Sequence, residues 1–215
     1  MPVTRVLHRA ANDRARHHLA AHPAVDVLEG DLWMRGGRLI AHHDRPLRPL
    51  PLTLHNRGFG RAPRDPVTFD ELAALMQSGT ALMMDLRSWF RDPTVDATKV
   101  LVPLADRSRI AITCESWPVA DRLRAWMPDL DVAYSVRSPR QLARYLDGRR
   151  DGSLAETHVS IRHTLLTSAR RLQELRQLAR RVSAWTVDDV DRAIELVGWG
   201  VDDLVSNRLQ VLNSI

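Results

Sequence analysis

The sequence lacks the features that mark secreted and membrane proteins. Cys114 is the only cysteine among 215 residues, so no intrachain disulfide is possible and nothing indicates an oxidising compartment. No stretch approaches the roughly 18 apolar residues of a membrane span. The N-terminus also lacks the long apolar run of a signal peptide. These absences predict a cytoplasmic protein without stable membrane insertion.

Lysine is almost absent, because Lys99 is the only one and arginine supplies nearly all of the positive charge. Lys and Arg together number 31 against 26 Asp and Glu, and a formal charge of +5 suits an anionic partner. No compact basic tract occurs, so we do not expect nucleic-acid binding. We expect instead a small anionic ligand. The composition does not indicate an oligomeric state.

Short apolar runs alternate with helical patterns along the whole chain, which is typical of repeated βα units. We predict barrel strands over residues 3–8, 24–33, 81–85, 109–114, 132–136, 158–163, 182–187 and 201–205. Helical periodicity is clearest over 169–180 and 187–197, and a first helix is expected over 11–21. No linker divides the chain. The pattern favours a single (β/α)8 TIM barrel spanning residues 1–215 over an open doubly wound sheet.

The segment after the second strand departs from the βα rhythm. Arg35, Gly36, Gly37 and Arg38 predict a hairpin turn that leads into residues 39–42. The proline-rich segment 46–66 predicts a long irregular loop. Thr68 and Glu71 then have the spacing of a capping box, which predicts the start of a helix.

Two acidic side chains share one face of the second strand. Glu29 and Asp31 are two residues apart, so both side chains point to the same side. Like charges placed together repel unless a cation lies between them, and carboxylate oxygens are the ligands that Mg²⁺ and Ca²⁺ prefer. Both residues fall late in the strand, at the end where barrel enzymes carry their active sites.

The hairpin returns a histidine to these acids. A two-residue turn places His42 opposite Asp31, whereas a three-residue turn places His43 there, and geometry alone does not choose between them. His8 ends the neighbouring first strand, and Arg9 follows it with a guanidinium that can clamp a phosphate. Two imidazoles, a cation site and an arginine together suit phosphodiester chemistry.

In these residues the chain resembles the glycerophosphodiester phosphodiesterases. That family has H-R-G after strand one, E-x-D on strand two, H-D after the hairpin, E-x-K on strand three and a W-T-V-N-D-like motif on strand seven. The corresponding segments here are His8-Arg9-Ala10, Glu29-Gly30-Asp31, His43-Asp44, Asp85-Leu86-Arg87 and Trp185-Thr186-Val187-Asp188-Asp189. The resemblance covers nearly the whole chain and is strongest over 3–46 and 181–208. An aspartate at position 85 is also similar to the related sphingomyelinase D and phospholipase D toxins.

The resemblance implies a role for each matched residue. Glu29, Asp31 and Asp85 would hold one divalent cation, Mg²⁺ or Ca²⁺. His8 and His43 would be the catalytic acid and base, in an order that the motifs do not assign. Arg9, Arg87 and Trp185 would contact the phosphate and the substrate. Motif alignment favours His43 over its neighbour His42.

The implied activity is hydrolysis of a glycerophosphodiester to glycerol phosphate and an alcohol. One alternative is phospholipase D-like cleavage of a lysophospholipid, with or without a cyclic phosphate product. Another is a barrel that binds a phosphorylated ligand without turnover. Ala10, Asp85 and Arg87, which depart from the family pattern, motivate the second alternative, whereas two histidines and three acids favour an enzyme.

Overall fold

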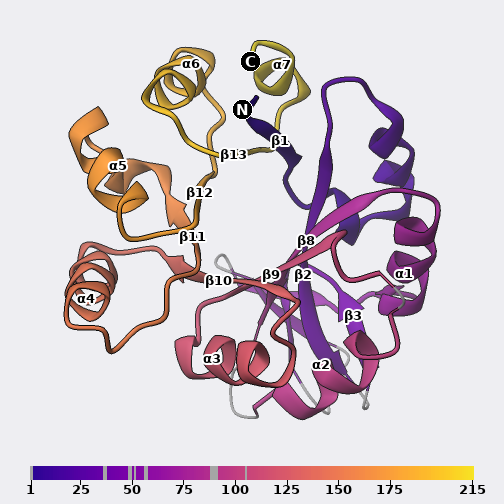
Figure 1. Cartoon of the computed structure of the whole chain (residues 1–215). Coiled ribbons are helices and arrows are strands. Elements are labelled where there is room, and N and C mark those ends of the chain that lie inside the picture. Colours follow the sequence, from indigo (N-terminus) through magenta and orange to yellow (C-terminus); the bar gives the residue numbers. More distant parts are fainter. Residues whose placement is uncertain are drawn as a thin grey trace.

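Within the residues that the computed structural model describes (2–35, 38–47, 50, 52–55, 58–87, 92–104 and 106–215), eight parallel strands close into a barrel (Figure 1). They are β1 (Thr4–Leu7), β2 (Val27–Arg35), β8 (Ala81–Leu86), β9 (Ile110–Cys114), β10 (Asp131–Val136), β11 (His158–Arg162), β12 (Arg181–Trp185) and β13 (Asp203–Ser206). The ring closes because β1 pairs with β2 on one side and with β13 on the other. The predicted TIM barrel is confirmed.

Helices surround this ring, and both chain termini lie beside one another where β1 meets the last helix (Figure 1). They are α1 (Phe69–Gln77), α2 (Thr94–Leu101), α3 (Trp117–Trp126), α4 (Pro139–Arg150), α5 (Ala169–Arg176), α6 (Val190–Trp199) and α7 (Leu209–Asn213). The predicted capping box is present, since the Thr68 hydroxyl accepts from the Glu71 N–H and the Glu71 carboxylate accepts from the Thr68 N–H. No helix in the described part of the chain is both long and apolar enough to span a membrane.

Apolar side chains form two separate packing regions. The larger one lies between the strands and the helices and includes Leu28, Leu82, Ile112 and Leu196. A small cluster of Val6, Met83 and Val205, with Trp185 packed against it, is separate from this region. The strands therefore carry apolar residues toward the helices and leave room among their other side chains for polar groups.

Polar side chains near the strand starts join several strands together. His158 is 1% exposed; its Nδ1 lies 3.2 Å from Asp131 Oδ2 and its Nε2 lies 2.5 Å from Ser183 Oγ. Ser183 Oγ in turn donates to Asp203, which also pairs with Arg181. Active sites in this fold lie at the carboxyl ends of the strands, which is the opposite end of the barrel, so we interpret this network as structural.

Residues 11–21 do not form the expected α-helix. They fold instead as the 3-10 helices η1 (Ala10–Asn12) and η2 (Arg14–Ala21), and η2 has no buried residue. The physical reason is that the segment has no apolar face long enough to hold an α-helix against the barrel. A third 3-10 turn, η3 (His163–Leu165), follows β11.

The prediction of a long irregular loop over 46–66 is wrong in part. It contributes a small antiparallel sheet, with β4 (Arg45–Leu47), β5 (Leu52–His55) and β6 (Gly58–Arg61). The predicted hairpin is present, because β2 pairs antiparallel with β3 (Arg38–Ala41), which also pairs with β7 (Val67–Thr68). The predicted turn residues Gly36 and Gly37 lie outside the described residues.

Candidate active site

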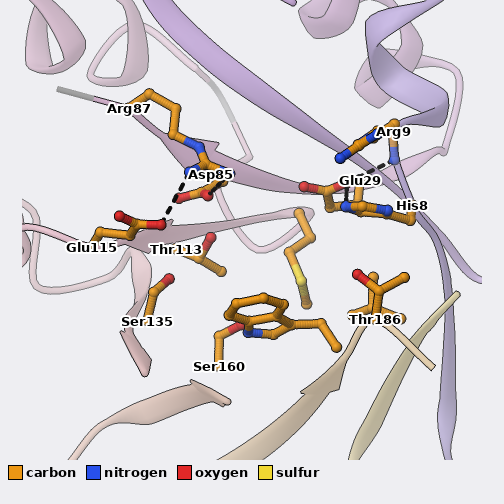
Figure 2. A pocket seen from close by; sticks show the side chains of 13 residues that line it. His8, Arg9, Glu29, Asp85, Arg87, Thr113, Glu115, Ser135, Ser160 and Thr186 are labelled. Carbon is orange, nitrogen blue, oxygen red and sulfur yellow. Dashed lines mark hydrogen bonds and ion pairs between the residues drawn. The ribbon is translucent and has the colours of Figure 1, made fainter. Parts of the chain in front are cut away.

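A cavity of about 140 Å³ opens where the barrel strands end (Figure 2). His8 and Arg9 follow β1, Glu29 lies on β2, Asp85 and Arg87 lie at the end of β8, and Glu115 follows β9. The cavity is also lined by Met83, Thr113, Ser135, Ser160, Trp185, Thr186 and Val205. Its position at the carboxyl ends of the strands is the position of active sites in this fold.

His8 is held in one orientation by a short hydrogen-bonded chain. Asn207 donates from Nδ2 to Asp188 Oδ2 at 2.7 Å, since a carboxylate can only accept. Its Oδ1 is then the acceptor that faces His8 Nδ1 at 2.8 Å. The Nδ1 proton is thereby fixed, and in the neutral ring Nε2 is left with a lone pair, 3.6 Å from Glu29 Oε2. Burial lowers the pKa of His8, more than the Asn207 hydrogen bond raises it.

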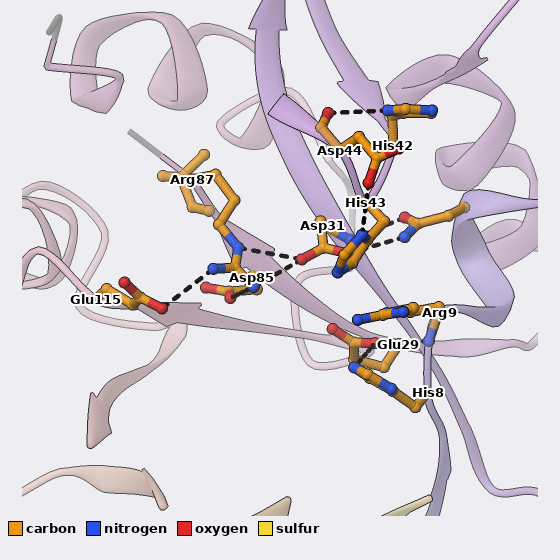
Figure 3. Close-up of polar contacts among 12 residues, drawn as sticks. His8, Arg9, Glu29, Asp31, His42, His43, Asp44, Asp85, Arg87 and Glu115 are labelled. Carbon is orange, nitrogen blue, oxygen red and sulfur yellow. Dashed lines mark hydrogen bonds and ion pairs between the residues drawn. The ribbon is translucent and has the colours of Figure 1, made fainter. Parts of the chain in front are cut away.

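Glu29 is bound to the backbone that follows His8. Its Oε2 accepts the Arg9 N–H at 2.7 Å, and Arg9 has a left-handed backbone with φ of 57° that turns this N–H toward the carboxylate. Burial raises the pKa of Glu29 well above its ordinary range, and repulsion by Asp31 adds to this. The Arg9 side chain extends over Glu29, so its charge lies at the edge of the cavity (Figure 3).

Asp31 is 1% exposed, and its carboxylate is bound by Asn12 on one side and by Arg87 on the other. Asn12 donates from Nδ2 to Asp31 Oδ2 and accepts the Asp31 N–H at Oδ1, both at 2.9 Å. This approach requires a glycine at position 30, since a Cβ there would lie 2.6 Å from Asn12 Oδ1 and 2.9 Å from Ala11 Cβ. The Glu-Gly-Asp sequence therefore sets two acids on one face and lets η1 pack against the strand between them.

Arg87 is the cation at the centre of the acidic side chains (Figure 3). Its Nη2 lies 2.8 Å from both Asp31 Oδ1 and Asp85 Oδ2, and its Nε donates to Asp31 Oδ1 at 3.1 Å. On the other side its Nη1 lies 3.1 Å from Glu115 Oε1. Arg137 holds Glu115 in turn, at 2.7 Å from Oε2. One guanidinium thus bridges carboxylates from β2, β8 and the end of β9.

The charge of Arg87 does not fully compensate the buried acids around it. Burial raises the pKa of Asp85 to about 7, although the nearby guanidinium works in the opposite direction. Burial lowers the pKa of Arg87, but Asp85 and Asp31 outweigh it, so that pKa is raised overall. Asp85 Oδ1 is buried and has no hydrogen-bond partner among the described residues. A further cation or proton would therefore be favourable at this oxygen.

The histidine pair after β3 resolves as the two-residue turn requires. The His42 N–H donates to the Asp31 carbonyl at 3.0 Å, so His42 is the residue opposite Asp31. Its ring, however, points to the Asp44 carbonyl, at 2.9 Å from Nδ1. The His43 ring lies toward Asp31 and His8, with its Nδ1 3.0 Å from Asp44 Oδ1 (Figure 3). Of the two, His43 is placed near the acids.

The far wall of the cavity consists of Trp185, Thr186 and the hydroxyl groups of Thr113, Ser135 and Ser160 (Figure 2). Trp185 is half-buried, lines the cavity and packs against the apolar cluster of Val6, Met83 and Val205. This wall offers an apolar face and several hydroxyl groups, and both suit the organic part of a polar ligand. His163 does not line the cavity.

The predicted metal ligands lie together but do not present a metal site as arranged. Asp31 and Asp85 are bonded to Arg87, and Glu29 is bonded to the Arg9 backbone. Within the described ranges, no group of three or more His, Cys, Asp or Glu side chains is arranged to hold a metal ion. We therefore derive no catalytic step through a metal, and the cation stays a prediction.

Some residues of the site are not evident from sequence patterns. Asn12, Glu115, Asn207, Ser135 and Ser160 are brought to the site by the fold. Glu115 directly follows a predicted strand, a position that could have been noticed. Asn12 and Asn207 carry no motif, because their role depends on contacts across strands that are far apart in the chain.

Comparison with known proteins gives a clear result for the fold. No family model matches the chain, and no curated protein matches it. Solved structures do. A phosphodiesterase of Oleispira antarctica, in complex with the product sn-glycerol-3-phosphate, has a TM-score of 0.75 and 16% identity, covering 98% of this chain and 96% of that one.

Two glycerophosphodiester phosphodiesterases are similar to the same extent. The protein from Parabacteroides distasonis has a TM-score of 0.74 and 14% identity, covering 98% of this chain and 95% of its own. The protein from Agrobacterium tumefaciens has a TM-score of 0.70 and 16% identity, covering 99% and 98%. At these identities the similarity establishes a shared barrel over nearly the whole length of the chains compared.

Proposed function

We propose that this chain is a phosphodiester hydrolase that cleaves glycerophosphodiesters to glycerol phosphate and an alcohol. The observation that carries the proposal is a cavity lined by a tautomer-fixed His8, two arginines and buried carboxylates, with a second imidazole, that of His43, beside the same acids. The solved structures that share the barrel are glycerophosphodiester phosphodiesterases, one of them with sn-glycerol-3-phosphate bound. A binding protein would not need two imidazoles at one anion site.

In this proposal His8 removes or delivers a proton through Nε2. Asn207 keeps the proton on Nδ1, so the lone pair on Nε2 is the one available at the cavity. The lowered pKa of His8 keeps the ring neutral near pH 7, as a base requires. His43 provides the complementary proton transfer to the leaving alkoxide or from the attacking hydroxyl group.

The phosphate is anchored by arginine. Arg9 and Arg87 both line the cavity, and a guanidinium can donate two hydrogen bonds to a phosphate; the Arg87 donors that face Asp31 and Asp85 become available when the side chain leaves these carboxylates. The arginines would stabilise the negative charge that develops on the phosphate oxygens in the transition state. Such electrostatic stabilisation is often the largest contribution to the rate enhancement of an enzyme. Trp185 and the hydroxyl wall would contact the glycerol or alcohol portion.

A second candidate is phospholipase D-like cleavage of a lysophospholipid. It is supported by the small sheet of β4, β5 and β6, which follows His43-Asp44 and exposes apolar side chains. Phe59 is 74% exposed and Leu50 next to the sheet is 57% exposed. Exposed large apolar side chains on an insertion next to the site suit contact with an acyl chain.

Product analysis separates these possibilities. Glycerophosphocholine and lysophosphatidylcholine would each be incubated with the protein and Mg²⁺ or Ca²⁺, and followed by phosphorus NMR. The proposal predicts sn-glycerol phosphate and free choline from the first substrate. Exclusive turnover of the second substrate, with a linear or cyclic lysophosphatidate, would favour the second candidate. Absence of turnover of both substrates with either ion would contradict both and favour a phosphate-binding barrel.

A further inference from the structure

We propose that Arg87 is an internal cation that takes the place of a divalent metal between Asp31 and Asp85, and that a metal ion binds these acids only by displacing it. The second, phosphate-binding role of Arg87 rests on the proposed function, whereas the competition between Arg87 and a metal ion concerns binding and not turnover. The two roles exclude each other in space, so Arg87 would exchange between them.

The first support is the position of the guanidinium. Its Nη2 is equidistant, at 2.8 Å, from one oxygen of Asp31 and one oxygen of Asp85. A cation that bridged the same two carboxylates would need the same lone pairs. A guanidinium and a metal ion repel each other and cannot share these oxygens. Occupation by Arg87 therefore lowers the affinity for a divalent ion directly.

The second support is the balance of charge. When ionised, Glu29, Asp31, Asp85 and Glu115 carry four negative charges (Figure 3) against the three positive charges of Arg9, Arg87 and Arg137, the last of which pairs with Glu115. An anionic phosphodiester would enter such a site against repulsion. A divalent ion would correct the balance, and the unpartnered buried Oδ1 of Asp85 shows where a ligand atom is available. The same acids that hold Arg87 are thus suited to the ion that would replace it.

The third support is that the guanidinium has a second carboxylate at hand. Glu115 lies 3.1 Å from Arg87 Nη1 and is itself fixed by Arg137, at 2.7 Å and 2.8 Å from its two oxygens. Arg87 can therefore leave Asp31 and Asp85 without losing every ionic partner. In that position it still lines the cavity, where the phosphate binds in the proposed function.

The test is direct measurement of Mg²⁺ and Ca²⁺ affinity by isothermal titration calorimetry, without substrate. Arg87→Met removes the charge and keeps much of the side-chain length, and we expect it to bind the ion at least tenfold more tightly than the unmodified chain. Arg137→Met is the matched control, because Arg137 touches Glu115 but neither Asp31 nor Asp85; its affinity should stay within about twofold. Arg87→Lys, a point charge without the planar fork, should fall between.

Thermal unfolding supplies a second readout that also reports folding. Without metal, Arg87→Met should melt at a lower temperature, because Asp31 and Asp85 lose the cation between them, and added Mg²⁺ should raise its melting temperature more than that of the unmodified chain. Equal or weaker affinity in Arg87→Met and Arg87→Lys, or no binding in any of the folded variants, would overturn the proposal. Because no substrate is present, this failure is distinct from a failure to hydrolyse phosphodiesters.

Discussion

The close approach of η1 to β2 makes position 30 sensitive to any side chain, by an amount that follows from the interatomic distances. In Gly30→Ala the new Cβ would meet Asn12 Oδ1 at 2.6 Å and Ala11 Cβ at 2.9 Å, and both distances are too short for real contacts. The 3-10 turn must move away from the strand, which breaks the two hydrogen bonds between Asn12 and Asp31. Overpacking costs about 1–3 kcal/mol, and the lost hydrogen bond to a carboxylate about 1.5–3 kcal/mol.

Partial relaxation makes the two costs overlap, so we expect the free energy of unfolding to fall by about 2–4 kcal/mol. Urea unfolding followed by circular dichroism measures it. Gly198→Ala is the control: Gly198 is exposed in α6, and a Cβ there meets nothing within 4 Å. Because alanine is the better helix former, this variant should gain about 0.5 kcal/mol.

A double-mutant cycle tests the physical reason. Asn12→Ala removes both the clashing oxygen and the two hydrogen bonds, so the pair Asn12→Ala with Gly30→Ala should cost clearly less than the sum of the single changes. Strict additivity, or a Gly30→Ala chain as stable as the unmodified one, would refute the reasoning. Either result would mean that η1 does not hold Asp31 as described.

Three further predictions concern separate parts of the molecule. Asn207→Leu removes the acceptor that fixes His8 Nδ1, so kcat for phosphodiester hydrolysis should fall at least about tenfold; the acidic limb of the pH profile should move to lower pH, because the Asn207 hydrogen bond raises the pKa of His8. Arg14 and the capping-box residue Thr68 lower the pKa of Glu71 to about 2. The stabilisation from the ionised Glu71 is therefore complete above pH 4.5 and is lost as the pH falls toward 2. At pH 7 Glu71→Gln should unfold at a lower urea concentration than the unmodified chain, whereas near pH 2 the two should unfold at the same concentration. Asp203→Asn breaks the buried network with Ser183, His158 and Arg181 and should cost about 3–5 kcal/mol in urea unfolding, while kcat of the folded fraction stays the same.

The order of the barrel could be predicted from the sequence because each βα unit carries its own apolar pattern. Residues such as Val182 and Leu204 alternate with polar neighbours or follow turn signals, so the strands are visible locally. The sheet of β4, β5 and β6 was not predicted, since prolines indicate edges and turns but do not exclude short antiparallel pairs. The prediction of an α-helix over 11–21 was wrong, because it rested on helix propensity alone and the segment has no apolar face that the barrel could bury.

The acids and histidines of the site were visible for a different reason. Glu29 and Asp31 share a strand, so period-two geometry places them together. Turn geometry alone did not choose between the two histidines, and motif alignment favoured His43; the structure adds that His42 lies opposite Asp31 yet turns its ring away. The engagement of Arg87 by three carboxylates depends on side-chain rotamers that no spacing rule contains. The cytoplasmic location and the absence of nucleic acid stay predictions.

The central claim is that the cluster around His8 and His43 hydrolyses phosphodiesters. Its most direct test is the rate of glycerol phosphate release from glycerophosphocholine by the unmodified chain, His8→Ala, His43→Ala and the neighbouring control His42→Ala. Loss of a proton-transfer group costs about 10²- to 10⁴-fold in rate, so we expect losses of this size for His8→Ala and His43→Ala and less than about fivefold for His42→Ala. Full activity of His8→Ala, or no release by the unmodified chain, would contradict the claim.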